Sequence, residues 1–274
     1  MTAARCVFLL RTLTPLLAGL LVIAVTVSLG NWQQRRALEK TELQAVLDAA
    51  ALHPAVAVTA SAPVGAPRDG AGPGVSLGQR VWLEGEWLTS AGIFLDNRTY
   101  AGRAGYHVLT PLRLADGSGV VLVNRGWVAT GADRTALPAM SVAPGKFALE
   151  ARVQFPEVNA FTLAKSGQIE EGRVWQVLDL TRLAARADVG VPLCAVGSAT
   201  PACLAPWIAL QTSDAEDGLV RDWPLPAAGI DRHRGYAFQW YSLAALAAAL
   251  TAGHAWRLFS RRLHDDSNPR FVGH

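Results

Sequence analysis

Charged residues are scarce in this chain of 274 residues. Asp, Glu, Lys and Arg make up 17% of it and hydrophobic residues 51%, whereas roughly a quarter of the residues of soluble globular proteins are charged. Common enzyme motifs are also lacking, because the sequence has no HExxH, no P-loop and no dinucleotide-binding glycine pattern. The three cysteines form neither a CxxCH haem-attachment motif nor a zinc-type CxxC pair. We therefore expect part of the chain to lie in lipid.

Two uncharged apolar runs, one near each end of the chain, predict two transmembrane helices. Leu13–Leu29 has seventeen residues, close to the minimum for a helix that crosses ~30 Å of hydrocarbon. Tyr236–Trp256 has twenty-one and carries aromatic residues near both ends, as membrane-interface anchors do. For the first run a cleaved signal peptide is the alternative, because Arg5 and Arg11 precede its apolar core and small residues follow it.

Arginines at the ends of both runs predict their orientation. Cytoplasmic flanks are enriched in basic residues, and the two terminal flanks carry Arg5, Arg11, Arg257, Arg261 and Arg262. The flanks that face the middle of the chain carry Arg35, Arg36, Arg232 and Arg234, so the bias is small. We expect spans at residues 12–30 and 235–257, cytoplasmic ends at 1–11 and 258–274, and a periplasmic domain at 31–234. The net charge of +3 comes from scattered arginines, which suit anionic lipid headgroups and do not indicate nucleic-acid binding.

The sequence between the two runs predicts a domain built mainly of strands. Apolar and polar residues alternate in Lys146–Pro156, which is typical of a half-buried strand. Leu109–Val128 contains two apolar runs around a DGSG hairpin turn signal. Shorter strand candidates are Val81–Leu88, Ile93–Leu95 and Val174–Leu180. The expected fold class is a membrane protein in which two transmembrane α-helices flank a mainly-β (α+β) extramembrane domain, either a small sheet or a partly closed barrel.

Three other features of the middle segment allow predictions. Arg35–Leu52 has apolar residues at roughly helical spacing and predicts a helix that leaves the membrane and ends at His53-Pro54. Residues 55–78 are rich in Ala, Pro, Gly and Val and predict a flexible insertion. Cys194 and Cys203 are close in sequence, so either a small loop disulfide or two free thiols is consistent with them.

Two Asn-Arg pairs are candidates for a binding surface. Asn97-Arg98 and Asn124-Arg125 each follow a strand-like apolar run and would place a guanidinium where a strand enters a turn. Such a group could hold a carboxylate or a partner surface; a structural turn with an exposed arginine is the simpler alternative. Gly74–Gly78 matches the hydrolase pattern GxSxG, but no strand is predicted before it, and we attribute the match to chance.

The outer end of the second apolar run carries a further constellation. His233, Tyr236 and Trp240 are spaced i, i+3, i+7 on one face of a helix. An imidazole there could ligate a haem iron while the two aromatic rings cover the macrocycle. Arg232 and Arg234 could reach the anionic propionates. An ordinary interfacial belt of His, Arg, Tyr and Trp is the alternative.

Several segments together resemble the surfeit locus protein 1 family of cytochrome c oxidase assembly factors. The segment LGNWQQR at 29–35 looks like the family's LGxWQxxR signature and directly follows the first run. LDNR at 95–98, GRAGYHVLTPL at 102–112 and VLVNRGWV at 121–128 continue the resemblance, and HRGYAFQWY at 233–241 is similar to the family's HxxYAxxWF/Y motif. The chain departs from the family at Asp231-Arg232, where asparagines are common, and at Ala129, where proline is common.

The resemblance implies a non-enzymatic assembly factor that helps to deliver haem a to subunit I of the oxidase. In bacterial relatives haem a binding is associated with the histidine that matches His233, which we therefore expect to be the iron ligand. The expected partners are subunit I, haem a synthase and the lipid bilayer. The resemblance favours an uncleaved first helix, and the lack of a long Arg- and Ser-rich transit segment favours a bacterial inner membrane.

A second hypothesis makes the protein a haem-independent scaffold that holds oxidase subunits during assembly. It assigns the partner-binding residues to the middle domain: Asn97, Arg98, Asn124, Arg125 and Trp127. A third and weaker hypothesis is a membrane-anchored hydrolase that uses Ser76.

Overall fold

The structure is a computed structural model that describes residues 3–62, 74–131, 136–138, 145–156, 170–195, 202–223 and 229–266. The chain forms two compact units, one of Met1–Gln44 with Pro224–His274 and the other of Ala45–Trp223. We call the first the helical unit and the second the β domain, and we describe each by itself.

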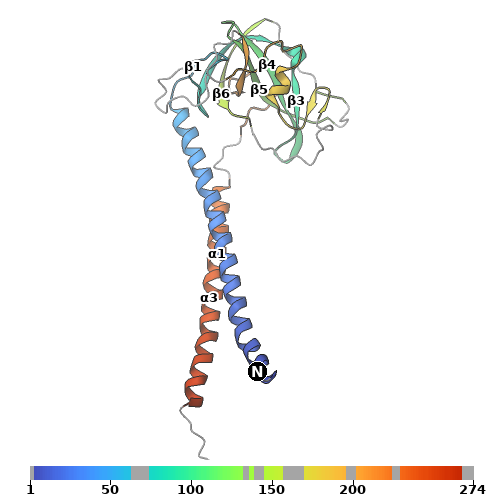
Figure 1. Cartoon of the computed structure of the whole chain (residues 1–274). Helices are drawn as coiled ribbons and strands as arrows, with labels where there is room; N and C mark the ends of the chain where they lie inside the picture. The colour runs from blue at the N-terminus through green and yellow to red at the C-terminus, as the bar shows by residue number, and fades with distance from the viewer. Residues whose placement is uncertain are drawn as a thin grey trace, which may run out of the picture. The chain divides into compact units, whose positions relative to one another are not determined.

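The helical unit consists of α3 (Ile230–Asp266) and most of α1 (Ala3–Ala51), whose last residues belong to the β domain. The two helices lie side by side and run in opposite directions (Figure 1). α1 has 49 residues, which makes it about 70 Å long, more than twice the ~30 Å hydrocarbon thickness of a bilayer. The helix predicted at Arg35–Leu52 is therefore the continuation of the helix that contains the first apolar run. It ends just before His53-Pro54, as predicted.

A seam of shielded residues joins α1 and α3. The less exposed positions recur at intervals of three and four residues on both helices, the spacing of a coiled coil. The seam residues are Leu16, Gly19, Ile23, Thr26, Gly30, Gln33 and Ala37 on α1, and His233, Ala237, Trp240, Ala244, Ala247 and Thr251 on α3. At Gly30 an added Cβ would lie 2.7 Å from the ring of Tyr241. Small residues thus let the two helices approach closely, as they do in membrane helix pairs.

α1 fits a membrane anchor. Among the described helices it is the one with a stretch long and apolar enough to cross a bilayer, Leu13–Ala51. Its leucines outside the seam are exposed, for example Leu17 at 64% and Leu21 at 65%, as lipid contact requires. α3 does not reach the same apolar level, because polar residues such as Gln239 and Ser242 interrupt its apolar run. The second predicted span therefore stays a prediction.

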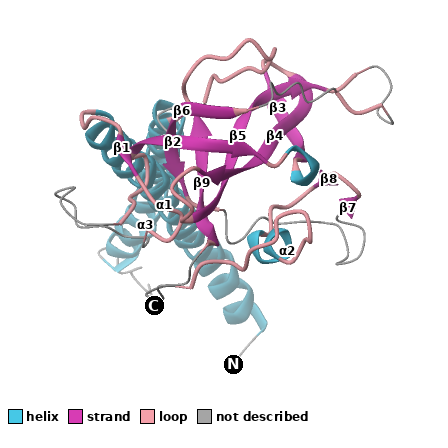
Figure 2. Cartoon of the chain, turned by 90° about the horizontal axis from the view of Figure 1, so that it is seen from above, coloured by secondary structure: helices cyan, strands magenta, loops and turns pink. Residues whose placement is uncertain are grey.

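The β domain is a barrel of five strands with further strands attached to it (Figure 2). The barrel strands are β2 (Arg80–Trp87), β6 (Lys146–Gln154), β9 (Cys203–Gln211), β5 (Gly119–Ala129) and β4 (Arg103–Leu114), in spatial order. β4 also pairs with β2, which closes the barrel. Neighbouring strands are antiparallel except β5 and β9, which are parallel. The predicted mainly-β domain is confirmed, and its barrel is closed rather than partly closed.

Shorter elements extend this sheet. β3 (Ile93–Tyr100) pairs with β4, β8 (Val174–Trp175) with β3, β7 (Glu170–Glu171) with β8, and β1 (Val56–Ala57) with β2. A 3-10 turn, η1 (Thr89–Ala91), precedes β3. The strand predicted at Val174–Leu180 is shorter than expected, because Asp179 caps a helix, α2 (Leu180–Ala184), by accepting from the Arg182 N–H.

Two apolar clusters hold the β domain together. The barrel interior is filled by alternate residues of all five strands, including Leu83, Leu112, Val121, Leu149 and Trp207. The second cluster lies between the sheet and α2 and includes Ile93, Leu95, Leu109, Leu122 and Leu183. In β6 the predicted alternation is confirmed, because Leu149, Ala151 and Val153 are buried and the residues between them are partly exposed.

No local sequence pattern predicts β9, the strand that completes the barrel. Eight of its nine residues are buried, so it lacks the alternation that predicts β6. Cys203 at its start forms a disulfide with Cys194, with the two Cα atoms 4.9 Å apart. Of the two alternatives for this cysteine pair, the loop disulfide is therefore the one that forms.

The segment 55–78, expected to be a flexible insertion, has ends that pack on the barrel. Val56–Ala57 forms β1, and Ala60 and Ala62 are buried. At the other end, the Gly78 N–H donates to the Val153 carbonyl at 2.8 Å. Residues 63–73 lie outside the described residues, as do residues 1–2 and 267–274 of the predicted cytoplasmic ends.

Candidate functional site

The predicted iron ligand, His233, lies in the first turns of α3 and faces α1. Its Nδ1 is 2.7 Å from Oε1 of Gln33. An amide oxygen can only accept a hydrogen bond, so Nδ1 carries the ring proton in this pairing and Nε2 carries the lone pair. Among the described contacts of His233, this is the hydrogen bond that its ring makes. The geometry therefore leaves Nε2 as the nitrogen for a ligand.

A second hydrogen bond between α1 and α3 lies beside this pair. The Tyr241 hydroxyl donates to Oδ1 of Asn31 at 2.7 Å. Gly30, one residue earlier, is the position where a side chain would collide with the Tyr241 ring. The segments LGNWQ of α1 and HRGYAFQWY of α3 thus contact each other at three residues of the first segment.

The remaining predicted cofactor residues are divided between the seam and the surface. Trp240 is half-buried in the seam with His233, whereas Tyr236 is 46% exposed. Arg232 and Arg234 are exposed, and the nearest carboxylate to Arg234 is that of Asp231, at 3.9 Å. The structure therefore places His233 and Trp240 on the same, seam-facing side of α3 and Tyr236 on an adjoining, exposed side.

These residues fit a haem group. Histidines that bind metals commonly donate their second ring N–H to a carbonyl or carboxylate oxygen, which is the arrangement of His233 and Gln33. An exposed aromatic ring and two exposed guanidinium groups within a turn of His233 match a hydrophobic macrocycle with anionic propionates.

The predicted partner-binding residues lie in the β domain, at β-bulges on the two strands that flank β4. Asn97 is in the bulge of β3, where Leu95 pairs with His107 and Arg98 with Gly105. Arg125 is the extra residue of the bulge in β5, where Gly126 pairs with Val108 and Asn124 with Leu109. β5 continues through its bulge to Ala129, so no turn directly follows Asn124-Arg125, whereas β3 ends at Tyr100 and a turn at Ala101-Gly102 follows two residues after Arg98. A bulge re-aims side chains.

Trp127 connects the two bulges. Its Nε1 donates to the Arg98 carbonyl on the far side of β4 at 2.8 Å. The indole lies over Gly105, where a Cβ would come within 2.4 Å of the ring. Its other face packs against Tyr100, with ring centroids 5.3 Å apart. The motifs at 95–98, 102–112 and 121–128 therefore form one packed cluster.

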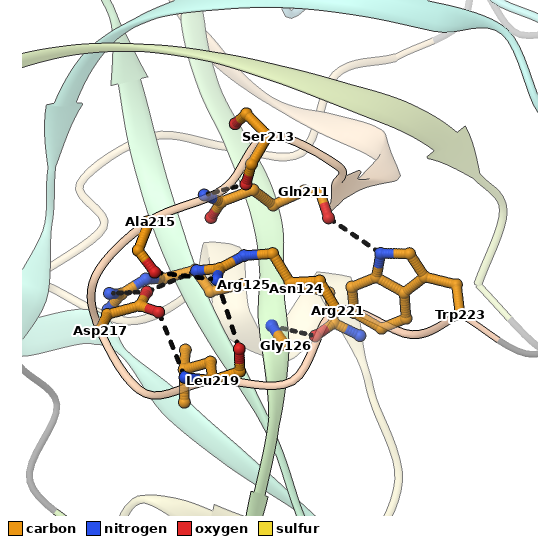
Figure 3. Close-up of polar contacts among 10 residues, drawn as sticks. All are labelled: Asn124, Arg125, Gly126, Gln211, Ser213, Ala215, Asp217, Leu219, Arg221 and Trp223. Atoms are coloured by element: carbon orange, nitrogen blue, oxygen red, sulfur yellow. Dashed lines mark hydrogen bonds and ion pairs between the residues drawn. The ribbon is translucent and has the colours of Figure 1, made fainter.

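Arg125 is buried and ion-paired rather than exposed. Its Nη2 lies 2.8 Å from Oδ2 of Asp217, which also accepts from Arg221, and all three side chains are less than one tenth exposed (Figure 3). The guanidinium also stacks 5.4 Å from the Trp87 ring centroid. Burial lowers the pKa of Arg125, and the Asp217 carboxylate opposes this effect. Burial would raise the pKa of Asp217, but hydrogen bonds from Arg221, Leu219 N–H and Arg125 hold it below its usual value.

Asn124 is buried as well and holds His107. Its Nδ2 donates to Nδ1 of His107 at 3.2 Å. Its Oδ1 accepts from the Gly126 N–H (Figure 3). Burial, the larger cause, and the nearby Arg98 charge together lower the pKa of His107 to about 4. Of the five predicted partner residues, Asn97 is exposed and Arg98 half-buried, whereas Asn124, Arg125 and Trp127 are buried.

Comparison with known proteins gives a family match whose range includes both the predicted cofactor residues and the predicted partner residues. The model of the SURF1 family matches residues 20–245. The chain belongs to the SURF1 family. A SURF1-like protein from Monosiga brevicollis is 29% identical over 244 residues, which are 85% of this chain and 84% of that protein. A SURF1-like protein from Dictyostelium discoideum is 40% identical over 52 residues, 19% of each chain. The SURF1 family is a family of cytochrome c oxidase assembly factors, not of enzymes.

The contact residues of the first motif of this SURF1 protein are not among the predicted site residues. Gln33, Asn31 and Gly30 belong to the LGNWQ segment, which carries the family resemblance but no predicted site residue. The spacing of three and four residues along both helices is a signal in the sequence that could have placed Gln33 on the face toward α3. No comparable local signal predicts Asp217 and Arg221, which approach Arg125 across 92 residues or more of chain.

Proposed function

We propose that this SURF1 protein is an assembly factor that binds haem a and assists its insertion into subunit I of cytochrome c oxidase. The observation that carries the proposal is the pairing of His233 Nδ1 with Gln33 Oε1, which leaves Nε2 of His233 to bind iron. Haem a, when bound, supplies the iron and redox chemistry that the oxidase needs, and the protein's own part is to bind, orient and release it.

Each nearby residue has a role in this proposal. His233 would supply a nitrogen ligand to the haem iron, and Tyr236 and Trp240 would shield the macrocycle from water. Arg232 and Arg234 pair with the propionates. A single exchangeable nitrogen suits hand-over better than a covalent thioether, which agrees with the lack of CxxCH in the sequence.

The proposal includes a place for the site in the membrane. α1 and α3 would both cross a bacterial inner membrane, with both termini cytoplasmic and the β domain periplasmic. His233 would then lie at the periplasmic edge, where Trp32, Tyr236 and Tyr241 match the aromatic belt of a membrane interface. Haem at this edge could pass to a membrane-embedded subunit I without crossing the aqueous phase.

The proposal is tested by the haem content of the purified protein. The full chain is purified in detergent from cells that make haem a, and its Soret absorbance per protein is compared with that of His233→Ala. We expect the variant to lose the bound haem, whereas His53→Ala, a substitution of an exposed histidine in the β domain, should keep it. Unchanged occupancy in His233→Ala would remove His233 from this role.

The scaffold hypothesis requires a different experiment. Because Asn124, Arg125 and Trp127 are buried, substitutions there test folding, and a contact surface must be tested at Asn97 and Arg98. Asn97 favours such a surface, since it is exposed in a bulge with φ of 59°. Capture of subunit I from cells that lack haem a, lost on Asn97→Ala and Arg98→Ala but kept by His233→Ala, would support the scaffold over the haem carrier.

A further inference from the structure

We propose that Gln33 is a positioning residue that holds the His233 imidazole as its Nδ1–H tautomer and thereby makes Nε2 the nitrogen that binds the iron of haem a. This inference rests on the proposed function and adds to it a residue of the LGNWQ segment. Half of the histidine site would then be contributed by α1, 200 residues away in sequence.

The hydrogen bond between Gln33 and His233 defines the tautomer. A neutral imidazole carries one proton, and either nitrogen can hold it. Oε1 of Gln33, 2.7 Å from Nδ1, can only accept, so the contact requires the proton on Nδ1. The lone pair, which a metal ligand needs, is then on Nε2 and is directed away from Gln33.

Gln33 is the residue of its segment that is placed for this task. It lies in the seam, whereas its neighbours Trp32 and Gln34 are exposed. Gly30, packed against the Tyr241 ring, and Ala37 are buried in the seam one turn before and one turn after Gln33, and this packing keeps Gln33 opposite His233. The acceptor is therefore fixed by packing on both sides and is not a side chain that swings freely in solvent.

The inference predicts how the site responds when the acceptor is changed. Loss of the hydrogen-bond partner of a metal-bound histidine typically weakens metal affinity about 10- to 100-fold. Gln33→Leu should therefore weaken haem a binding to that extent. Gln33→Glu should keep the haem affinity near that of the wild type, because it keeps an acceptor for Nδ1–H. It should also lower the reduction potential of the iron, because a carboxylate is a stronger acceptor and makes the imidazole a better electron donor to the ferric form.

A haem-free measurement tests the tautomer directly. The full chain is prepared without haem, labelled with 15N in histidine only, and studied by NMR in detergent at about pH 8, above the ordinary imidazole pKa of about 6.5. His233 is assigned from the signal that is missing in His233→Ala. We expect the Nδ1–H tautomer in the wild-type chain and in Asn31→Leu, and a shift toward Nε2–H in Gln33→Leu. A wild-type Nε2–H tautomer, or an unchanged one in Gln33→Leu, would overturn the inference.

Haem a titration of the same variants separates this inference from the proposed function. Asn31→Leu is the matched control, because it removes the neighbouring hydrogen bond between α1 and α3 without touching His233. Gln34→Leu is a second control, because it makes the same change of Gln to Leu one residue away, at an exposed position. We expect both controls to bind within about threefold of wild type, while Gln33→Leu falls about 10- to 100-fold.

The outcomes of this titration distinguish a failure of the proposed function from a failure of the role of Gln33. If His233→Ala keeps its haem, the proposed function fails, whatever the tautomer. If His233→Ala loses haem but Gln33→Leu binds as wild type does, the function stands and the role of Gln33 fails. If Asn31→Leu weakens binding as much as Gln33→Leu, the effect comes from helix pairing, and the role of Gln33 fails again.

Discussion

Amide side chains hold two histidines of this protein in opposite tautomers. Asn124 donates to Nδ1 of His107, which leaves that ring's proton on Nε2, whereas Gln33 accepts from Nδ1 of His233. His107 is half-buried in β4 and packs edge-on against Trp223, with ring centroids 5.6 Å apart. At the scale of single residues, the hydrogen-bond neighbour decides the role of each ring. Asn124 makes Nδ1 of His107 an acceptor within the fold, whereas Gln33 leaves the lone pair of His233 on Nε2.

The buried His107 predicts a pH dependence of the stability of the β domain. The unfolded chain takes up a proton here near pH 6.5 and the folded chain only near pH 4. Between these values the unfolded state binds more protons, so stability is full above about pH 6.5 and falls as the pH drops. The loss should reach about 3 kcal/mol near pH 4, because one pKa unit corresponds to about 1.4 kcal/mol.

This dependence is measured by denaturant unfolding of the full chain in detergent at a series of pH values. His107→Phe keeps a ring beside Trp223 but cannot titrate, so its stability should change little between pH 4 and 6.5. His53→Phe, at an exposed position, should keep the wild-type slope. An equal slope in His107→Phe and wild type would contradict the assignment.

The Asp217 carboxylate, shared by Arg125 and Arg221, predicts a large effect of one substitution. Asp217→Asn removes the carboxylate that two buried guanidinium groups share, and removing one partner of a buried ion pair typically costs about 3–5 kcal/mol. Glu150→Gln removes one partner of the Arg80–Glu150 pair, whose Arg80 side chain is 41% exposed, and should cost about 1 kcal/mol or less. Denaturant unfolding measures the free energy of unfolding of both variants. If Asp217→Asn loses as little of it as Glu150→Gln, the buried ion pairs are not essential for stability.

At the scale of elements, β-bulges and helix spacing position the functional groups. The bulges in β3 and β5 place Asn97 at the surface and turn Arg125 inward, although both belong to Asn-Arg pairs. In the helical unit, glycines of α1 let α3 approach, and this approach brings Gln33 within hydrogen-bond distance of His233. A change in helix spacing should therefore act on the histidine site from a distance.

Gly30→Leu tests this coupling between helix spacing and the site. A side chain at Gly30 collides with the Tyr241 ring, so the helices should separate by about 1–2 Å, toward the 8–10 Å usual for helices with larger contact residues. Gly235→Leu is the matched control on α3, because a Cβ there meets nothing within 4 Å.

The separation is measured between spin labels at Leu20 and Leu250, both exposed positions. Together with the wider spacing, Gly30→Leu should weaken haem a binding about 10-fold or more, as expected when the hydrogen bond to a ligating histidine is lost. A chain in which Gly30→Leu and Gly235→Leu give the same spacing and the same haem affinity would refute the coupling.

At the scale of the whole molecule, the two helices differ in how clearly they belong to a membrane. α1 meets the apolar criterion for a span, and α3 does not, because it carries alanines rather than leucines and several polar residues. α3 can still cross a bilayer if α1 covers its seam, since Ala237 and Ala244 are buried against α1. If both helices cross the membrane, the C-terminus and the β domain lie on opposite sides of it. If α1 alone crosses, they lie on the same side.

Fusion reporters decide between these topologies. With two spans, green fluorescent protein at the C-terminus should fluoresce in the cytoplasm. Alkaline phosphatase inserted at Gly117, an open turn where a Cβ meets nothing within 4 Å, should be active in the periplasm. With one span, the C-terminus would be on the same side as the β domain and the fluorescence would be lost. The Cys194–Cys203 disulfide agrees with an oxidising compartment for the β domain.

Local patterns explain which strands the sequence predicts. β4, β5 and β6 have alternating residues or a DG turn between them, and both signals are carried by neighbouring residues. β9 has neither, because it lies between β5 and β6 with both faces covered, and its role depends on partners more than 50 residues away. For the same reason Arg125 was expected at the surface, since its counter-charge lies 92 residues further along the chain.

The sequence by itself determined the apolar anchor, the strand-rich domain and the two motifs that resemble the SURF1 family, because each rests on residues close together in the chain. Only the tertiary structure decided that the barrel closes, that three of the five predicted partner residues are buried, and that the two motifs meet. These depend on contacts between distant segments, such as Gln33 with His233 across 200 residues. No local pattern encodes such contacts, because their energy comes from packing that exists only once the chain has folded.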